Sequence, residues 1–107
     1  PFPITEDNYK KGFVTKEENK IVLDDETNTI ELVTKNGNSL KISDDLKGFV
    51  IEDENSNKIT MNDQGISIES CKDFNVKATG NIKIEGVNVN AEGSGNMVLK
   101  GAMINLN

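Results

Sequence analysis

The sequence predicts an all-β protein: an intertwined triple-stranded β-helix, a homotrimeric prism, preceded by a short strand meander and an irregular lead-in. Three observations lead to this prediction. Apolar residues recur in pairs two positions apart, Gly, Asn and Asp separate the pairs, and only 35% of the residues are hydrophobic and 5% aromatic. Alternation with period two is typical of strands, and so few apolar residues leave a single chain little with which to build a core.

Residues 1–18 are interpreted as the lead-in. Two prolines, Tyr9 and a charged patch interrupt any pattern there, although Gly12–Thr15 has the composition of a short strand. The chain begins at Pro1 without Met and without a signal-like segment. We therefore expect it to be a piece of a longer protein.

Residues 19–62 are predicted to form longer-spaced strands in a meander. The spacing leaves room for turns at Asp24–Asn28, Lys35–Ser39, Ser43–Gly48 and Asp53–Lys58. Asn-Gly, at positions 36 and 37, is a dipeptide typical of hairpins. The first members of the apolar pairs lie 9 or 10 residues apart: Ile21/Leu23, Ile30/Leu32, Leu40/Ile42, Phe49/Ile51 and Ile59/Met61.

Residues 63–107 are predicted to form a tighter repeat, the triple β-helix itself. The pairs recur about every 8 residues, a short period that favours a stacked β architecture. Val87 follows Ile82 by only 5 positions, and Met97 follows Val87 by 10, which predicts a slip or loop near residues 93–95. The pairs are Ile66/Ile68, Phe74/Val76, Ile82/Ile84, Val87/Val89, Met97/Leu99 and Ile104/Leu106.

A shared core follows from how little each repeat offers. Two or three inward apolar side chains per repeat cannot enclose a core within one chain, whereas three chains can fill the centre of a prism and pair their strand edges. We therefore expect a homotrimer without a folded monomer. The predicted trimer core is Ile59, Met61, Ile66, Ile68, Phe74, Val76, Ile82, Ile84, Val87, Val89, Met97, Leu99, Ile104 and Leu106.

The composition argues against several kinds of chemistry. The chain has no His, and a formal net charge of −6 makes nucleic acid an unsuitable partner. The acidic pairs at 24–25, 44–45 and 53–54 are interpreted as solvated turns, and Cys71 as a structural thiol. No apolar run approaches the roughly 18 residues of a membrane span. We expect no enzyme activity, no catalytic or metal-binding residues and no cofactor.

Four pieces, taken in order, resemble the β-helical spike of the VgrG proteins of type VI secretion and the central spike proteins of contractile phage tails. Residues 12–16 and 19–25 are similar to the entry into that spike, and residues 58–70 to its K-I-x-(M/L)-x-x-x-G-I-x-I-x-S segment. Residues 79–84 resemble its G-N-I-x-I repeat, and residues 101–107 resemble the usual end of the helix. The resemblance covers about residues 12–107.

The resemblance implies a role. It implies a preceding barrel domain, now missing, through which the tube and baseplate proteins are contacted, and it places residues 19–62 at the base of the spike. The protein would be a membrane-puncturing spike of a bacterial or phage injection apparatus. It would be assembled in the cytoplasm, translocated into the target cell, transmit force and carry effectors or a tip protein.

The tip protein implied by the resemblance has Pro-Ala-Ala-Arg (PAAR) repeats and would sit on the C-terminal end. The expected surface for it is Met103, Asn105, Leu106 and Asn107. No His-x-His motif of the kind that binds iron at some phage spike tips is present. Two alternatives remain open: a trimeric fibre or adhesin shaft, and a single-chain, carbohydrate-active β-helix.

Overall fold

The computed structural model describes residues 10–107. The first nine residues of the predicted lead-in, Tyr9 among them, lie outside this range. The chain divides into two units: one ends at Phe74, and the other comprises Asn75–Asn107. Residues 10–107 contain no helix that could span a membrane.

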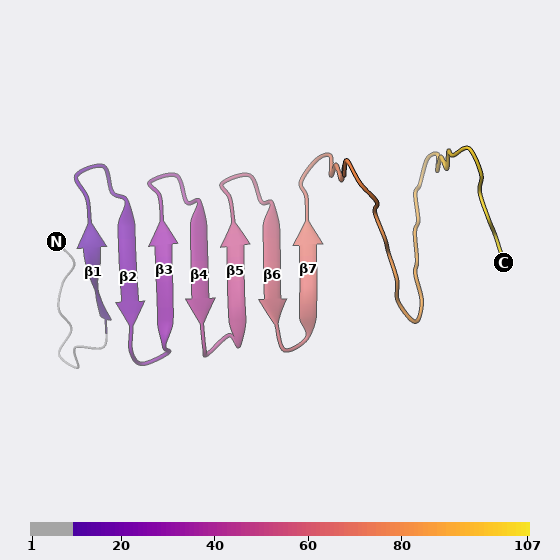
Figure 1. Cartoon of the computed structure of the whole chain (residues 1–107). Coiled ribbons are helices and arrows are strands. Elements are labelled where there is room, and N and C mark those ends of the chain that lie inside the picture. The colour runs from indigo at the N-terminus through magenta and orange to yellow at the C-terminus, as the bar shows by residue number, and fades with distance from the viewer. Residues whose placement is uncertain (1–9) are drawn as a thin grey trace. The chain divides into compact units, whose positions relative to one another are not determined.

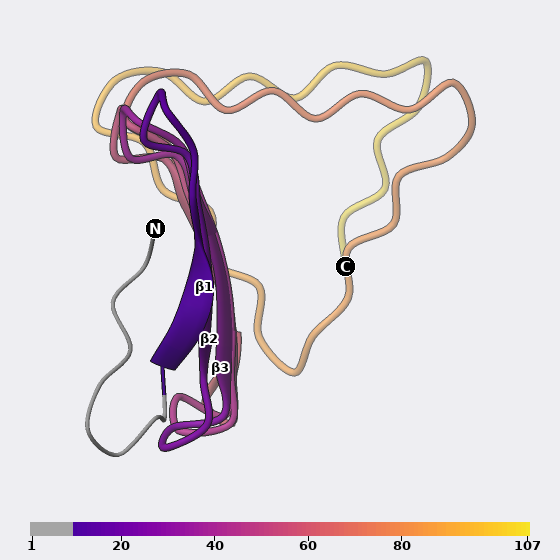
Figure 2. The same cartoon turned by 90° about the vertical axis from the view of Figure 1, so that its left-hand side faces the viewer.

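The first unit is a single antiparallel sheet in which each strand pairs with the next strand along the chain (Figure 1). In Figure 2, where β1 faces the viewer, the strands nearly superimpose, so the sheet is one layer with little twist. Flat sheets of many strands are uncommon and depend on stacking or on side-chain ladders. The strands are β1 Lys10–Val14, β2 Lys20–Asp24, β3 Thr29–Val33, β4 Ser39–Ser43, β5 Gly48–Glu52, β6 Lys58–Asn62 and β7 Gly65–Glu69.

The register of the strands places the apolar pairs of the sequence side by side in two rows. Because side chains alternate between faces, both rows lie on the same face of the sheet. We call this the apolar face. The first row is Phe13, Ile21, Leu32, Leu40, Ile51, Ile59 and Ile68; the second is Leu23, Ile30, Ile42, Phe49, Met61 and Ile66.

The four turns predicted between residues 24 and 58 all connect strands. The sheet extends beyond the predicted meander at both ends, because β1 begins within the predicted lead-in and β7 within the predicted tight repeat. The division into residues 1–18, 19–62 and 63–107 stays a prediction.

Three turns at the same end of the strands share one hydrogen-bond pattern, which repeats every 19 residues. Each starts with Thr or Asp directly after a strand and ends four residues later with Asn. The backbone N–H of the first residue donates to the carbonyl of the Asn, at 2.9–3.1 Å, and the N–H of the Asn donates back to the side-chain oxygen of the first residue. The turns are Thr15–Asn19, Thr34–Asn38 and Asp53–Asn57.

The three asparagines also connect each turn to the next turn at the same end of the strands. Each side-chain Oδ1 accepts a hydrogen bond from the backbone N–H of the second residue of the next turn. We call this series the asparagine ladder. Its bonds are Lys35 N to Asn19 (3.3 Å), Glu54 N to Asn38 (2.9 Å) and Cys71 N to Asn57 (2.8 Å).

The second unit has no paired strands. Residues 75–107 form no backbone-to-backbone hydrogen bond with one another and contain no strand. The sequence predicted strands here, and the difference has a physical reason: a strand is defined by a hydrogen-bonded neighbour, and these segments have none in their own chain.

Within residues 10–107 no hydrophobic side chain is buried. The one buried residue in this range is Ser43, whose hydroxyl lies 2.8 Å from that of Thr29 and accepts a bond from the N–H of Leu46. A polar contact between the ends of β3 and β4 is therefore the most enclosed point of the described chain. The single chain has the strands of a folded domain without its core.

Candidate trimerisation surface

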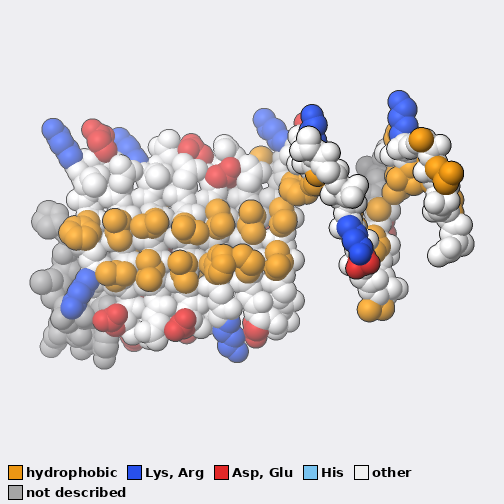
Figure 3. Space-filling model, viewed as in Figure 1, with side chains coloured by type: hydrophobic (Ala, Val, Ile, Leu, Met, Phe, Trp, Pro, Cys, Tyr) orange, Lys and Arg blue, Asp and Glu red, His pale blue; other side chains and the backbone are white. Residues whose placement is uncertain are grey.

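The apolar face is a continuous hydrophobic stripe on the single chain. Figure 3 shows it as two parallel orange rows, of which the first runs from β1 to β7 and the second from β2 to β7. Nine of its thirteen side chains are classed as exposed, with Phe13 at 70% and Ile66 at 71%, and the other four are half-buried. An exposed apolar area that spans a whole sheet marks an interaction surface.

The opposite face has a different character. Its central row runs through Val22, Glu31, Lys41, Val50 and Thr60. Glu31 and Lys41 are direct cross-strand partners, and their charged groups lie 3.6 Å apart. Charged pairs tolerate water and resist burial. The sheet therefore has one face suited to solvent and one suited to another protein surface.

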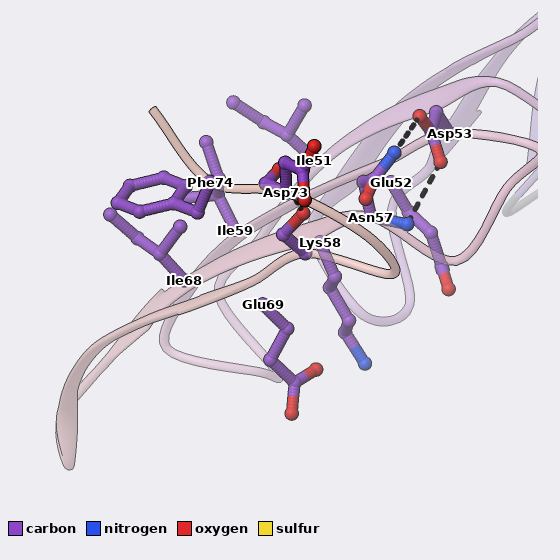
Figure 4. Close-up of a pocket in the computed structure, with 11 residues that line it drawn as sticks. Ile51, Glu52, Asp53, Asn57, Lys58, Ile59, Ile68, Glu69, Asp73 and Phe74 are labelled. Atoms are coloured by element: carbon purple, nitrogen blue, oxygen red, sulfur yellow. Dashed lines mark hydrogen bonds between the residues drawn. The ribbon is translucent and has the colours of Figure 1, made fainter. Parts of the chain in front are cut away.

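A groove marks the C-terminal end of the first apolar row. Ile51, Ile59 and Ile68 line it together with Phe74, the last residue of the first unit, and its volume is about 360 Å³. Figure 4 shows the Phe74 ring beside Ile68, on the same side of the sheet as Ile59. The apolar stripe therefore continues past β7 to Phe74.

Asp53 and Asn57 form the polar rim of this groove. Hydrogen bonds from the Asn57 side chain, at 2.8 Å, and from the Asn57 backbone, at 2.9 Å, lower the pKa of the Asp53 carboxyl below its ordinary value. The N–H of Asn55 also donates to this carboxylate, at 2.9 Å. All these partners belong to the turn itself, so the arrangement stabilises a turn and offers no open site for a substrate.

One family of known proteins matches this chain. The sequence model of the phage baseplate V C-terminal trimerisation domain matches residues 29–107, about three quarters of the chain. The chain belongs to this family. Comparison with curated proteins found no match. A trimerisation domain accounts for a sheet whose apolar face has no cover within its own chain.

Membership of this family confirms two predictions from the sequence. The chain is all-β, and the family fits a β-helical prism. It also corresponds to the C-terminal region of a VgrG-like phage spike. At this level the protein is a structural, self-associating domain of a phage-tail-like spike.

The structure places the predicted core residues in both units. Ile59, Met61, Ile66 and Ile68 lie in the two rows of the apolar face. The members beyond Phe74 are all exposed in the single chain: Val76, Ile82, Ile84, Val87, Val89, Met97, Leu99, Ile104 and Leu106. Their role in a trimer stays a prediction, as does that of the expected tip surface, where Met103, Asn105, Leu106 and Asn107 are also exposed.

The predicted core omitted the apolar residues of β1 to β5, although the same rows continue through them. The signal was present in the sequence, because the pairs from Ile21 to Ile51 alternate like those that follow. The asparagine ladder was missed as well, although a 19-residue spacing of Asn19, Asn38 and Asn57 was its signal.

The acidic pairs, apart from Asp24, and the cysteine lie in turns. Asp25, Asp44, Asp45, Asp53 and Glu54 all fall between strands, as predicted, and Asp24 ends β2. Cys71 is a free, exposed thiol in the single chain, in the turn that follows β7. Within residues 10–107 no group of three or more His, Cys, Asp or Glu side chains is arranged to hold a metal ion.

Proposed function

We propose that this chain is the rod of a membrane-puncturing spike in a contractile injection machine, either type VI secretion-like or phage tail-like. The observation that carries the proposal is the uncovered apolar face, which in a family of trimerisation domains calls for two further copies of the chain. Three such faces enclose a dry core, and the polar faces form the outside. A closed rod of this kind transmits force along its axis.

The second unit supports the same proposal through its backbone. Extended residues without a hydrogen-bonding partner in their own chain must bond to water or to another chain. In a trimer of interwound chains, each extended leg finds its partners in the other two copies. The same winding pairs the strand edges that would otherwise remain open.

The first test is the solution mass of the 107-residue chain, measured by light scattering on a size-exclusion column. The proposal expects a particle of three times the 11.7 kDa chain mass. Ile84→Asp brings three carboxylates together near the axis and is expected to abolish this particle. Val98→Asp is the matched control and should leave it unchanged, because Val98 lies between Met97 and Leu99 and therefore points away from the predicted core. A monomeric parent chain, or a trimeric Ile84→Asp variant of unchanged stability, would refute the shared core.

Puncturing is tested in the intact contractile particle that carries the full-length protein. Particles with the parent sequence should release dye from target vesicles when the sheath contracts, and particles with a trimer-deficient spike should not. A particle that attaches to vesicles without releasing dye would instead favour the alternative, a fibre or adhesin shaft.

The C-terminal residues are proposed to carry a PAAR-type tip protein. Met103 is 78% exposed, and Leu106 is more exposed still. Met103→Asp should weaken co-elution of a PAAR-repeat protein with the trimer, because a carboxylate is placed in an apolar contact. Val98→Asp, at a residue of similar exposure, is the control. Equal co-elution of both variants would place the tip protein elsewhere.

A further inference from the structure

The second unit consists of extended legs separated by bends. In Figure 2 the orange-to-yellow part of the trace shows these legs and the corners between them. The bends start at Thr79, Val87, Ser94 and Ala102. Successive bends are therefore 8, 7 and 8 residues apart. This spacing is more regular than the spacing of the apolar pairs.

Counted between the bends, the side chains of the legs follow one pattern. The first and third positions are apolar, and the fifth is glycine. The legs are Ile82, Ile84, Gly86; then Val89, Ala91, Gly93; then Met97, Leu99, Gly101; and Ile104 and Leu106 begin the next. The starting residues are 7, 8 and 7 positions apart, so the short and long gaps around Val87 disappear.

The geometry of the corners independently supports these starting positions of the legs. Two residues separate Gly86 from the next leg, and two separate Gly101 from its next leg. At both glycines a Cβ atom would meet the carbonyl oxygen two residues ahead, at 3.1 Å from Asn88 and 3.3 Å from Met103. Gly93 precedes a three-residue corner, and there the nearest oxygen is that of Asn96, at 3.5 Å. The two corners of equal length therefore place the same carbonyl oxygen at a similar distance from their glycine.

We infer that the surface by which this segment binds two further copies of the chain begins each leg at Ile82, Val89, Met97 and Ile104, and that Val87 lies outside it. Val87 is in a corner and is 101% exposed. Side chains alternate between two faces along an extended leg. When the starts of two legs are 7 positions apart, both can face inward only because the corner between the legs absorbs the extra residue. Ala91, in contrast, belongs to the inward set.

This inference rests on the proposed trimer, so the parent chain must first be shown to be trimeric. The test then compares Val87→Asp with Val89→Asp in the 107-residue chain. We expect Val89→Asp to lose the trimer in light scattering, and Val87→Asp to keep the parent mass and the parent denaturation midpoint. Loss of the trimer in both variants would overturn the inference and leave the trimer proposal intact. Retention in both, or the reverse result, would also overturn it.

Cysteine labelling provides a second test that does not require a disruptive charge. Val87→Cys and Val89→Cys are placed in a Cys71→Ser background and treated with a bulky maleimide under native conditions. We expect the thiol at position 87 to be labelled in the trimer, and the thiol at position 89 to stay unlabelled until the trimer is denatured. Equal labelling of the two thiols would refute the inference.

Discussion

Asn38→Ala tests whether the asparagine ladder stabilises the sheet. The Asn38 side chain holds Glu54 in the next turn by two hydrogen bonds: Oδ1 accepts from the Glu54 backbone N–H at 2.9 Å, and Nδ2 donates to the Glu54 carboxylate at 2.9 Å. Nδ2 also lies 3.2 Å from the Thr34 hydroxyl. The substitution removes all three contacts and leaves the backbone bonds of the turn in place.

The magnitude follows from the two bonds to Glu54. A side-chain hydrogen bond contributes about 0.5–1.5 kcal/mol to the free energy of unfolding. We therefore expect Asn38→Ala to cost about 1–3 kcal/mol per chain, towards the lower end because the site is exposed. In a trimer that unfolds as one unit the loss occurs three times, so about 3–9 kcal/mol is expected per particle.

Guanidinium denaturation measures this loss, with all variants at the same chain concentration because a trimer's stability depends on concentration. Asn36→Ala is the control, since Asn36 lies in the same turn and its side chain makes no hydrogen bond within residues 10–107. The parent and Asn36→Ala should have similar midpoints, and Asn38→Ala a lower one. Equal midpoints for the two variants would show that the ladder contributes nothing.

Three further predictions concern the first unit. Ile30→Asp should prevent trimer formation in light scattering, because an unpaired carboxylate in the shared core costs about 3–5 kcal/mol per chain, whereas Val22→Asp on the opposite face should not. Gly48→Ala should lower the free energy of unfolding by about 1–3 kcal/mol, because its Cβ would clash with the Met61 carbonyl oxygen. The pKa of Asp53 is lowered in the folded chain. Its contribution to the free energy of unfolding is therefore complete above an ordinary Asp pKa of about 3.9 and is lost as the pH falls through the lowered value. Denaturation midpoints measured at decreasing pH should show the parent losing more stability than Asp53→Asn below about pH 3.9.

Much of the fold could be predicted from the sequence because its signal is local. Alternating pairs such as Ile30 and Leu32 define strands, and the Asn and Asp residues between them define turns. The position of the last paired strand could not be predicted in this way. Residues 65–69 and 82–86 alternate alike, yet only the first segment has a strand beside it in the same chain.

The starting residue of each leg in the second unit also could not be predicted from the pattern of apolar residues alone. Val87 and Val89 form a pair that looks like any other, and only the bend at Val87 shows that the leg starts two residues later. Hydrophobicity indicates which residues alternate. Where an extended leg begins is decided by the backbone at the corner, and there the glycine before the corner is the more informative residue.

The place where the chain stops pairing with itself coincides with the end of the asparagine ladder. Ser70 follows β7 as Thr15, Thr34 and Asp53 follow the earlier strands, and the Ser70 hydroxyl still organises a turn by donating to the Asp73 carbonyl at 2.7 Å. Four residues after Ser70, where the earlier turns have Asn, the chain has Phe74. Phe74 offers no amide to a further turn, and its ring lines the groove at the end of the apolar row. A single substitution in the repeat thus exchanges a contact within the chain for an apolar surface that other copies can cover, at the residue where the first unit ends.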